Sequence, residues 1–306
     1  MRTLFFGTPA IAAEALVALH ATTEVAAVVC QPDRPAGRGL ALKPPETKVF
    51  ALEHGIPVHQ PKKVRTAAFA QWVREQEADY AVVIAYGRIL PKAVLDAPAG
   101  GCLNLHASIL PKYRGAAPIN WAIVHGETET GICLMQMDEG MDTGPVFATR
   151  TIPIGSEETA GELYGRLGKL AQEIIRQDLP RVPTLTAAPQ DHGAATMAPM
   201  LKREDGLVDW SQPAARVHDH VRGMTPWPGA HTTLDGKRFK LLRTKPFDGE
   251  VEGPPGTVHA LGRKRLLVAC REGAVELIEA QLAGKKAQPA PQLLGGRTVT
   301  DGTKLG

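Results

Sequence analysis

The hydrophobic positions in the first half of the chain form short, nearly continuous runs separated by stretches with helical spacing. Runs rich in Val, Ile and Leu that alternate with helices are typical of a parallel sheet covered on both faces. A long amphipathic helix is predicted over 159–178, where apolar side chains recur every three or four residues. The predicted strands lie at 2–7, 25–30, 80–86, 102–106 and 132–137, and helical stretches run up to residue 20, over 66–78 and over 116–125.

The pattern changes in the last third of the chain. Residues 180–200 contain four prolines and no apolar periodicity, which predicts a linker. A helical stretch at 212–223 then precedes short strands, and Asp235-Gly236 is a two-residue hairpin signal between two of them. Short antiparallel strands favour a small barrel, with an oligonucleotide-binding fold (OB-fold) as the leading interpretation. The sequence therefore predicts an α/β fold: a doubly wound, mostly parallel-sheet domain over 1–179, a linker over 180–206, and a small antiparallel β-barrel (OB-fold) domain over 207–306.

Composition narrows the class of protein. Hydrophobic residues make up 43% of the chain, which is enough for a sizeable core, so global disorder is excluded. No apolar run reaches the roughly 18 residues that a membrane span needs. The four cysteines are scattered without a C-x-x-C pair, a pattern that fits a reducing compartment and disfavours disulfides or a zinc site. We expect a soluble cytoplasmic protein.

Charge is distributed unevenly along the chain, whose net charge is +3. Residues 1–200 carry 18 Lys and Arg against 20 Asp and Glu, whereas residues 201–306 carry 17 against 12. A basic second part is typical of a module that contacts a polyanion. Ordinary scatter over a solvated surface accounts equally well for so small an excess.

Asn104 and His106 are the first candidates for chemistry. Because they lie two apart in a predicted strand, their side chains project to the same face, at the end where parallel sheets bind ligands. An amide and an imidazole side by side can stabilise an oxyanion, and the imidazole can also shuttle a proton. Taken alone, the pair is better explained as a strand-end Asn and a hydrogen-bonded core His.

A second cluster of polar residues follows the predicted strand at 132–137. Asp138, Glu139 and Asp142 lie in one Gly-containing loop, and a carboxylate that faces an imidazole orients it and stabilises its charged form. A polar turn is the competing interpretation. No second His or Cys accompanies these acids at ligand spacing, so no metal site is expected.

The stretch over 31–48 is too long to be a simple strand-to-helix link, which usually has about 2–6 residues. It carries Arg34, Arg38, Lys43 and Lys48, and guanidinium groups on a loop beside a cleft are suited to phosphate contacts. A solvated loop is the alternative. The turn at residues 7–9 lacks the glycines of a G-x-G-x-x-G fingerprint, which disfavours a dinucleotide-binding dehydrogenase.

Several motifs together resemble the folate-dependent formyltransferases, and within them the enzymes that act on methionyl-tRNA. The general motifs are "NLHASILPKYRG" and "DTG", which indicate the reaction class. The loop "QPDRPAGRG" and the presence of a second domain narrow the resemblance to the tRNA enzymes. Further matches are "FFGTPAIAAEAL", "VVIAYGRILPKAVL", "KREDGLVDW", "TPWPGA" and "GKKAQPA", so nearly the whole chain is covered.

The resemblance implies a formyltransferase domain joined to an OB-fold domain. The implied reaction moves a formyl group from 10-formyltetrahydrofolate to the methionyl amine of initiator tRNA, without a metal, by a monomeric enzyme. The competing functions are a related formyltransferase or hydrolase acting on a small amine, an amino sugar nucleotide or water, and an idle tRNA-binding protein. The implied site residues are Asn104, His106 and Asp142 for catalysis, Ser108, Ile109, Leu110 and Pro111 for folate, and Arg38 for tRNA, with Arg34 and Lys43 beside it in the same basic loop.

Overall fold

The computed structural model describes the chain except for residues 37–40, 250, 263 and 296–298, so the predicted tRNA contact Arg38 lies outside the described residues. Two compact units are present. The N-terminal unit consists of residues 1–118, 130–152 and 164–199, and the C-terminal unit consists of residues 119–129, 153–163 and 200–306.

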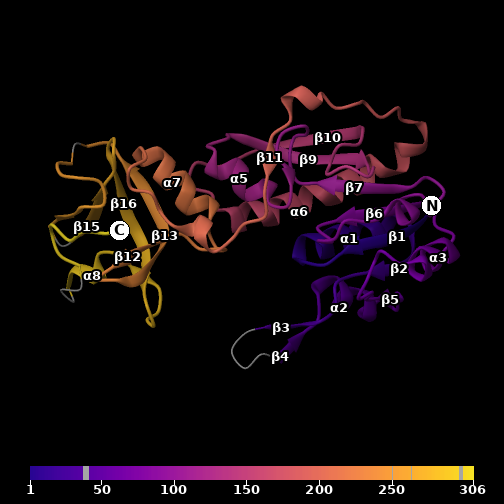
Figure 1. The fold of residues 1–306 in the computed structure, drawn as a ribbon, viewed down its shortest axis with the longest axis horizontal. Helices are drawn as coiled ribbons and strands as arrows, with labels where there is room; N and C mark the ends of the chain where they lie inside the picture. The colour runs from indigo at the N-terminus through magenta and orange to yellow at the C-terminus, as the bar shows by residue number, and fades with distance from the viewer. Residues whose placement is uncertain (37–40, 250, 263, 296–298) are drawn as a thin grey trace. The chain divides into compact units, whose positions relative to one another are not determined.

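A seven-stranded sheet forms the centre of the N-terminal unit, with strand order β10-β9-β7-β6-β1-β2-β5 (Figure 1). Strands β1, β2, β5, β6 and β7 pair in parallel, and β9 runs antiparallel to β7. The predicted mostly parallel α/β sheet is therefore confirmed. Its strands are β1 (Arg2–Gly7), β2 (Glu24–Val29), β5 (Val58–His59), β6 (Tyr80–Ile84), β7 (Cys102–His106), β9 (Glu129–Gln136) and β10 (Val146–Pro153).

The apolar runs become strands because both faces of the sheet are covered. Leu4, Phe5 and Phe6 are consecutive in β1 and all are fully buried, which a strand with one solvated face would not allow. Phe6 packs edge-on against Phe69 and Tyr86. By contrast β10, whose exposed positions alternate along its length, lies at the sheet edge and gave no continuous apolar run.

The helices follow the apolar spacing in the sequence. Helix α6 (Ala160–Gln177) has its Leu163, Leu167 and Ile174 side chains fully buried. Thr159 and Glu162 form a reciprocal capping box at its start, since each side chain accepts the other's backbone N–H. The remaining helices of this part of the chain are α1 (Ala10–Thr22), α2 (Glu46–Glu53), α3 (Ala67–Glu75), α4 (Lys92–Leu95) and α5 (Pro118–Val124).

Two short pairs of strands stand apart from the main sheet. β3 (Arg34–Ala36) and β4 (Ala41–Lys43) pair antiparallel, so part of the predicted basic loop is a two-stranded arm (Figure 1). β8 (Arg114–Gly115) pairs in parallel with β11 (Met197–Ala198). Because β11 pairs with β8, the chain belongs to the N-terminal unit as far as Pro199. The three-part division at residues 179 and 206 remains a prediction.

The C-terminal unit contains an antiparallel half-barrel sheet of order β12-β13-β16-β15-β14, with β17 paired to β16. Asp235 and Gly236 both have positive φ, as the predicted hairpin between β12 and β13 requires. Helix α7 (Ala214–Gly223) packs against β13, and α8 (Gln292–Gly295) follows β17. The strands are β12 (His231–Leu234), β13 (Lys237–Phe247), β14 (Val258–Leu261), β15 (Arg265–Ala269), β16 (Ala274–Leu282) and β17 (Gln288–Pro289).

Two further observations concern the cysteines and the helices. Cys30, Cys102, Cys133 and Cys270 are all free and buried. Within the part of the chain that the structure describes, none of the helices combines the length and apolar content needed to cross a membrane.

Candidate active site

The end of β7 presents two of the predicted catalytic residues. Pairing with β9 sets Asn104 opposite Met135 and His106 opposite Cys133, so the two side chains lie on one face of the sheet. Asn104 is half-buried, whereas the His106 side chain is only 5% exposed. An imidazole buried to this degree requires hydrogen-bond partners from the protein.

The Asp142 carboxylate contacts both of these side chains. Its Oδ1 accepts a hydrogen bond from Asn104 Nδ2 at 3.2 Å, and its Oδ2 lies 3.6 Å from His106 Nδ1. The same Oδ2 accepts the backbone N–H of Gly115 at 2.9 Å. Asp142 comes from the connection between β9 and β10. The structure thus brings the three predicted catalytic residues together.

The two nitrogens of the His106 ring have different partners. Nε2 lies 2.9 Å from the Tyr113 carbonyl oxygen. Because a carbonyl only accepts, Nε2 carries a hydrogen and donates it. Nδ1 faces the Asp142 carboxylate, 3.6 Å from Oδ2. A buried carbonyl and a carboxylate thereby fix the orientation of the ring.

Both partners of the His106 ring have strained backbones. Tyr113 has φ of 60° and Asp142 has φ of 54°, in the left-handed region that costs a side-chain-bearing residue about 1–2 kcal/mol. Ala85, at the end of β6, has φ of 47°. Strain of this kind persists only where surrounding contacts maintain it, and it concentrates at functional sites.

The predicted folate residues form the loop that leaves β7. Ser108 is fully buried, and its hydroxyl donates to the Lys112 carbonyl at 2.6 Å, so it closes a turn of this loop. Ile109, Leu110 and Pro111 are half-buried and offer mainly apolar surface. The Leu110 N–H donates to Cys133 Sγ at 3.4 Å, which ties the loop to β9.

A cavity of about 400 Å³ lies at the carboxyl ends of β1, β2 and β6, and its walls include Thr8, Gln31 and Tyr86. In the sheet, β1 has β2 on one side and β6 on the other, so this is where the chain order reverses and where ligands of such sheets bind. Arg34 and Lys43 also line the cavity. Two of the three predicted tRNA-contacting residues therefore lie together.

Lys48, the fourth cation of the basic loop, is engaged within the protein. Its ammonium group bonds Asp33 at 2.8 Å and Gln60 at 2.9 Å. The Lys48 contact, together with that of Gln60, lowers the pKa of the Asp33 carboxyl below its ordinary value. Gln60 also donates to the Gln31 carbonyl at 2.8 Å. These contacts fasten the base of the β3–β4 arm.

Three residues at the site were missed by sequence reasoning. Tyr113 supplies a carbonyl and Gly115 an N–H, and backbone groups leave no trace in the type of residue. Gln190 donates to the carbonyls of Asp142 and Gly144 from within a Pro-rich stretch that has no periodicity. Only glycine fits at position 115, because its φ is 120° and the carbonyl of Ala198 leaves no room for a side chain.

Comparison with known proteins identifies the family. A family model described as "Formyl transferase" matches residues 1–179, and one described as "Formyl transferase, C-terminal domain" matches residues 200–298. The methionyl-tRNA formyltransferase of Sorangium cellulosum is 59% identical over the whole of both chains. That of Geobacter metallireducens is 49% identical over 99% of this chain and 98% of the relative. The chain belongs to the methionyl-tRNA formyltransferase family. The resemblance noted in the sequence is confirmed.

Solved structures agree with this fold. HypX from Aquifex aeolicus in complex with tetrahydrofolic acid has a TM-score of 0.62 at 22% identity, covering 96% of this chain and 47% of HypX. The methionyl-tRNA formyltransferase from Clostridium thermocellum has a TM-score of 0.54 at 19% identity, covering 82% and 95%. The sugar 3N-formyl transferase WlaRD has a TM-score of 0.69 at 17% identity, covering 94% and 99%. These likenesses show the fold.

Asp142→Asn tests the role of the carboxylate in this formyltransferase. Oδ1 accepts from Asn104, and Oδ2 accepts from Gly115 and faces His106. An amide supplies only one accepting oxygen and no charge, so at least one of these groups loses its partner. We expect single-turnover formyl transfer to slow by at least about 100-fold, with tetrahydrofolate affinity nearly unchanged by fluorescence titration.

Asp138→Asn is the matched control for that variant. Asp138 lies in the same loop, but its Oδ1 accepts from Gly140 N–H and from the Thr143 hydroxyl, at 3.0 and 2.6 Å. We expect this variant to keep most of the wild-type rate. Near-normal turnover of Asp142→Asn would contradict the role given to the carboxylate.

Proposed function

We propose that this protein transfers the formyl group of 10-formyltetrahydrofolate to the α-amino group of methionyl initiator tRNA in the cytoplasm, acting as a monomer. The observation that carries the proposal is the Asp142 carboxylate, which contacts Asn104, His106 and the Gly115 N–H at once. The match to methionyl-tRNA formyltransferases over the full chain supports the choice of substrates.

Asn104 is suited to stabilise the charge that develops during the transfer. The methionyl amine attacks the formyl carbon as the free base, which needs no strong base because an α-amino group has a pKa of about 7.7–8.0. Attack produces a tetrahedral oxyanion. One N–H of the Asn104 amide bonds Asp142, which aims the other N–H at this oxygen. Removing one such donor typically slows a reaction about 10²–10³-fold.

His106 and Asp142 together handle the proton. The attacking nitrogen must lose one proton, and N10 of the folate must gain one as its bond to the formyl carbon breaks. Nε2 of His106 is occupied by the Tyr113 carbonyl, so Nδ1 and the adjacent carboxylate accept the proton from the amine. Nδ1 then donates a proton to the departing N10. The sum is a formylated amine and tetrahydrofolate, with no proton gained or lost.

The folate is proposed to lie against the loop that follows His106. Because the Ser108 hydroxyl is used within that loop, the surface offered to the ring system comes from Ile109, Leu110 and Pro111. An apolar, half-buried wall suits a planar heterocycle, which gains affinity by shedding water from its faces. Ser108 contributes by fixing the shape of the turn.

The β3–β4 arm is proposed to contact tRNA phosphates. Arg34 and Lys43 are directly opposite each other in its register, and both are exposed. Like charges facing each other across two strands are destabilising, and Lys43 is partly neutralised by its ion pair with Glu46 at 2.8 Å, so Arg34 is the cation that gains most from a bound phosphate. Arg38, outside the described residues, belongs to the same segment and is proposed to reach the acceptor stem.

The C-terminal unit is proposed to complete an OB-fold that holds the tRNA backbone. Its half-barrel sheet has the antiparallel pairing that such a barrel needs, and residues 201–306 carry the excess of positive charge. In this proposal residues 1–179 form the formyltransferase domain, 180–206 the connection, and 207–306 the tRNA-contacting domain.

The choice of acceptor tests the proposed function. With 10-formyltetrahydrofolate as donor, we expect rapid formylation of methionyl initiator tRNA, and far slower reaction with methionyl elongator tRNA, free methionine or water. The KM for tRNA should rise steeply with ionic strength, because each phosphate contact releases counterions. Turnover with a small amine, an amino sugar nucleotide or water but not with tRNA would contradict the proposed acceptor. The roles proposed for Asn104, His106 and Asp142 would then still stand.

Arg38→Ala tests the role of the basic loop. The variant should weaken reaction with initiator tRNA, since one phosphate-contacting cation is lost, and leave slow formylation of a methionine ester nearly intact. Arg74→Ala, which removes an exposed arginine from α3, is the charge-matched control. Equal losses on tRNA and on the ester in Arg38→Ala would contradict the assignment.

A further inference from the structure

Residues 188–198 border the candidate active site, although the sequence predicts a linker there. Ala188 forms an antiparallel bridge with Val146 at the start of β10. Further along, Met197 and Ala198 pair as β11 with Arg114 and Gly115. The stretch between these pairings therefore lies close to two loops of the site, the one that carries Asp142 and the one that carries Tyr113 and Gly115. We call it the 188–198 segment.

Gln190, near the start of the 188–198 segment, joins these two loops. Its Nε2 donates to the carbonyl oxygens of Asp142 at 2.9 Å and Gly144 at 2.7 Å. Its Oε1 accepts from Arg114, at 3.1 Å from Nε and 2.7 Å from a terminal guanidinium nitrogen. The orientation of the amide is unambiguous, because carbonyls only accept and a guanidinium only donates.

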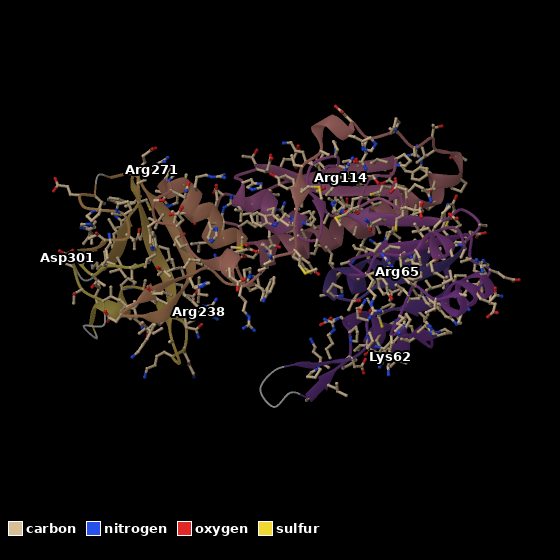
Figure 2. The ribbon with its side chains drawn as sticks, in the orientation of Figure 1. Lys62, Arg65, Arg114, Arg238, Arg271 and Asp301 are labelled. Atoms are coloured by element: carbon tan, nitrogen blue, oxygen red, sulfur yellow. The ribbon has the colours of Figure 1, made fainter. Side chains whose placement is uncertain are left out.

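Arg114 gives Gln190 a rigid support on the far side of the amide. It projects from β8 (Figure 2) and is only 6% exposed, so its guanidinium depends on partners within the protein. Besides Gln190 it donates to His192 Nδ1 at 3.0 Å. Arg114 also directly precedes Gly115, whose N–H bonds the Asp142 carboxylate. Gln190 thus bonds the Asp142 backbone directly, and through Arg114 and the adjacent Gly115 it is also linked to the Asp142 carboxylate.

The same segment holds both strained residues of the site. The Asp142 carbonyl accepts from Gln190, and the Tyr113 N–H donates to the Thr196 hydroxyl at 2.9 Å. These two residues have left-handed backbones and contact opposite nitrogens of the His106 ring. Without an external bond, a left-handed residue of this type relaxes to a more favourable φ. Relaxation at Asp142 would turn its carboxylate away from Asn104 and His106.

We propose that Gln190 is a positioning residue for formyl transfer: by clamping the Asp142 loop to Arg114, it keeps the Asp142 carboxylate between Asn104 and His106. This inference rests on the catalytic role proposed for Asp142. Gln190 itself acts through Asp142 and does not react. A displacement of about 1 Å in a reacting group is sufficient to slow catalysis 100-fold.

Gln190→Glu separates positioning from folding. A glutamate keeps, and strengthens, the contact with Arg114, so the segment stays anchored. It places a carboxylate oxygen against two carbonyl oxygens where the wild type has an N–H donor, so the clamp on the Asp142 loop is lost. We expect kcat to fall about 10–100-fold, with much smaller changes in KM for either substrate. Gln190→Ala, which removes both sides of the clamp, should behave similarly.

Gln76→Ala is the matched control. The Gln76 side chain also donates to a backbone carbonyl, that of Trp72 at 3.0 Å. Gln76 lies at the C-terminus of α3, next to the start of β1, which is the end of the sheet opposite the site. We expect wild-type kcat from this variant. A fall in kcat for Gln76→Ala equal to that for Gln190→Glu would reduce Gln190 to a general structural residue and overturn the inference.

A double-mutant cycle distinguishes this inference from the proposed function. If Gln190 acts through Asp142, Gln190→Glu should slow the wild-type enzyme strongly and the Asp142→Asn enzyme hardly at all. Equal slowing in both backgrounds, or no slowing of the wild type, would overturn the inference while leaving the role of Asp142 in place. Near-normal turnover of Asp142→Asn alone would instead contradict the catalytic role proposed for Asp142, whereas the proposed function itself is tested by the choice of acceptor.

Discussion

The Asp142 carboxylate is the constraint on which the rest of the site depends. It accepts from the Asn104 amide and the Gly115 N–H and faces the Nδ1 edge of His106. With its side chain only 17% exposed, this carboxylate is stabilised by such partners, and these partners in turn gain fixed orientations. One carboxylate is therefore stabilised and arranges the groups that we propose to carry out formyl transfer.

The fold supplies these groups from positions far apart in the sequence. Parallel strands bring the end of β7 next to β6, and the antiparallel β9 returns the chain so that the loop after it lies beside His106. The left-handed backbones of Tyr113 and Asp142 are then maintained by bonds from Gln190 and Thr196. The strained backbones at the site therefore depend on the hydrogen bonds made by the 188–198 segment.

Much of the fold could be predicted because its signals are local. The run at 2–7 became β1, the periodicity over 159–178 became α6 at 160–177, and Asp235-Gly236 formed its hairpin. Elements with weak local signals were missed, among them the two-residue β5 and the exposed edge strand β10. The grouping of Asn104, His106 and Asp142 was implied by motif, whereas the contributions of Tyr113, Gly115 and Gln190 were not. These act through backbone groups or long-range contacts, which residue type and spacing do not encode.

The protonation of the His106 ring is the most direct test of this account. Nitrogen-15 NMR of histidine-labelled protein, with the His106 signals assigned by their absence from a His106→Gln variant, reports which ring nitrogens carry hydrogen. The contact with the Tyr113 carbonyl requires hydrogen on Nε2, with Nδ1 facing Asp142. A signal showing a protonated Nε2 at neutral pH is the expected result. A ring with hydrogen on Nδ1 alone would contradict the arrangement in which Tyr113 and Asp142 hold the imidazole between them.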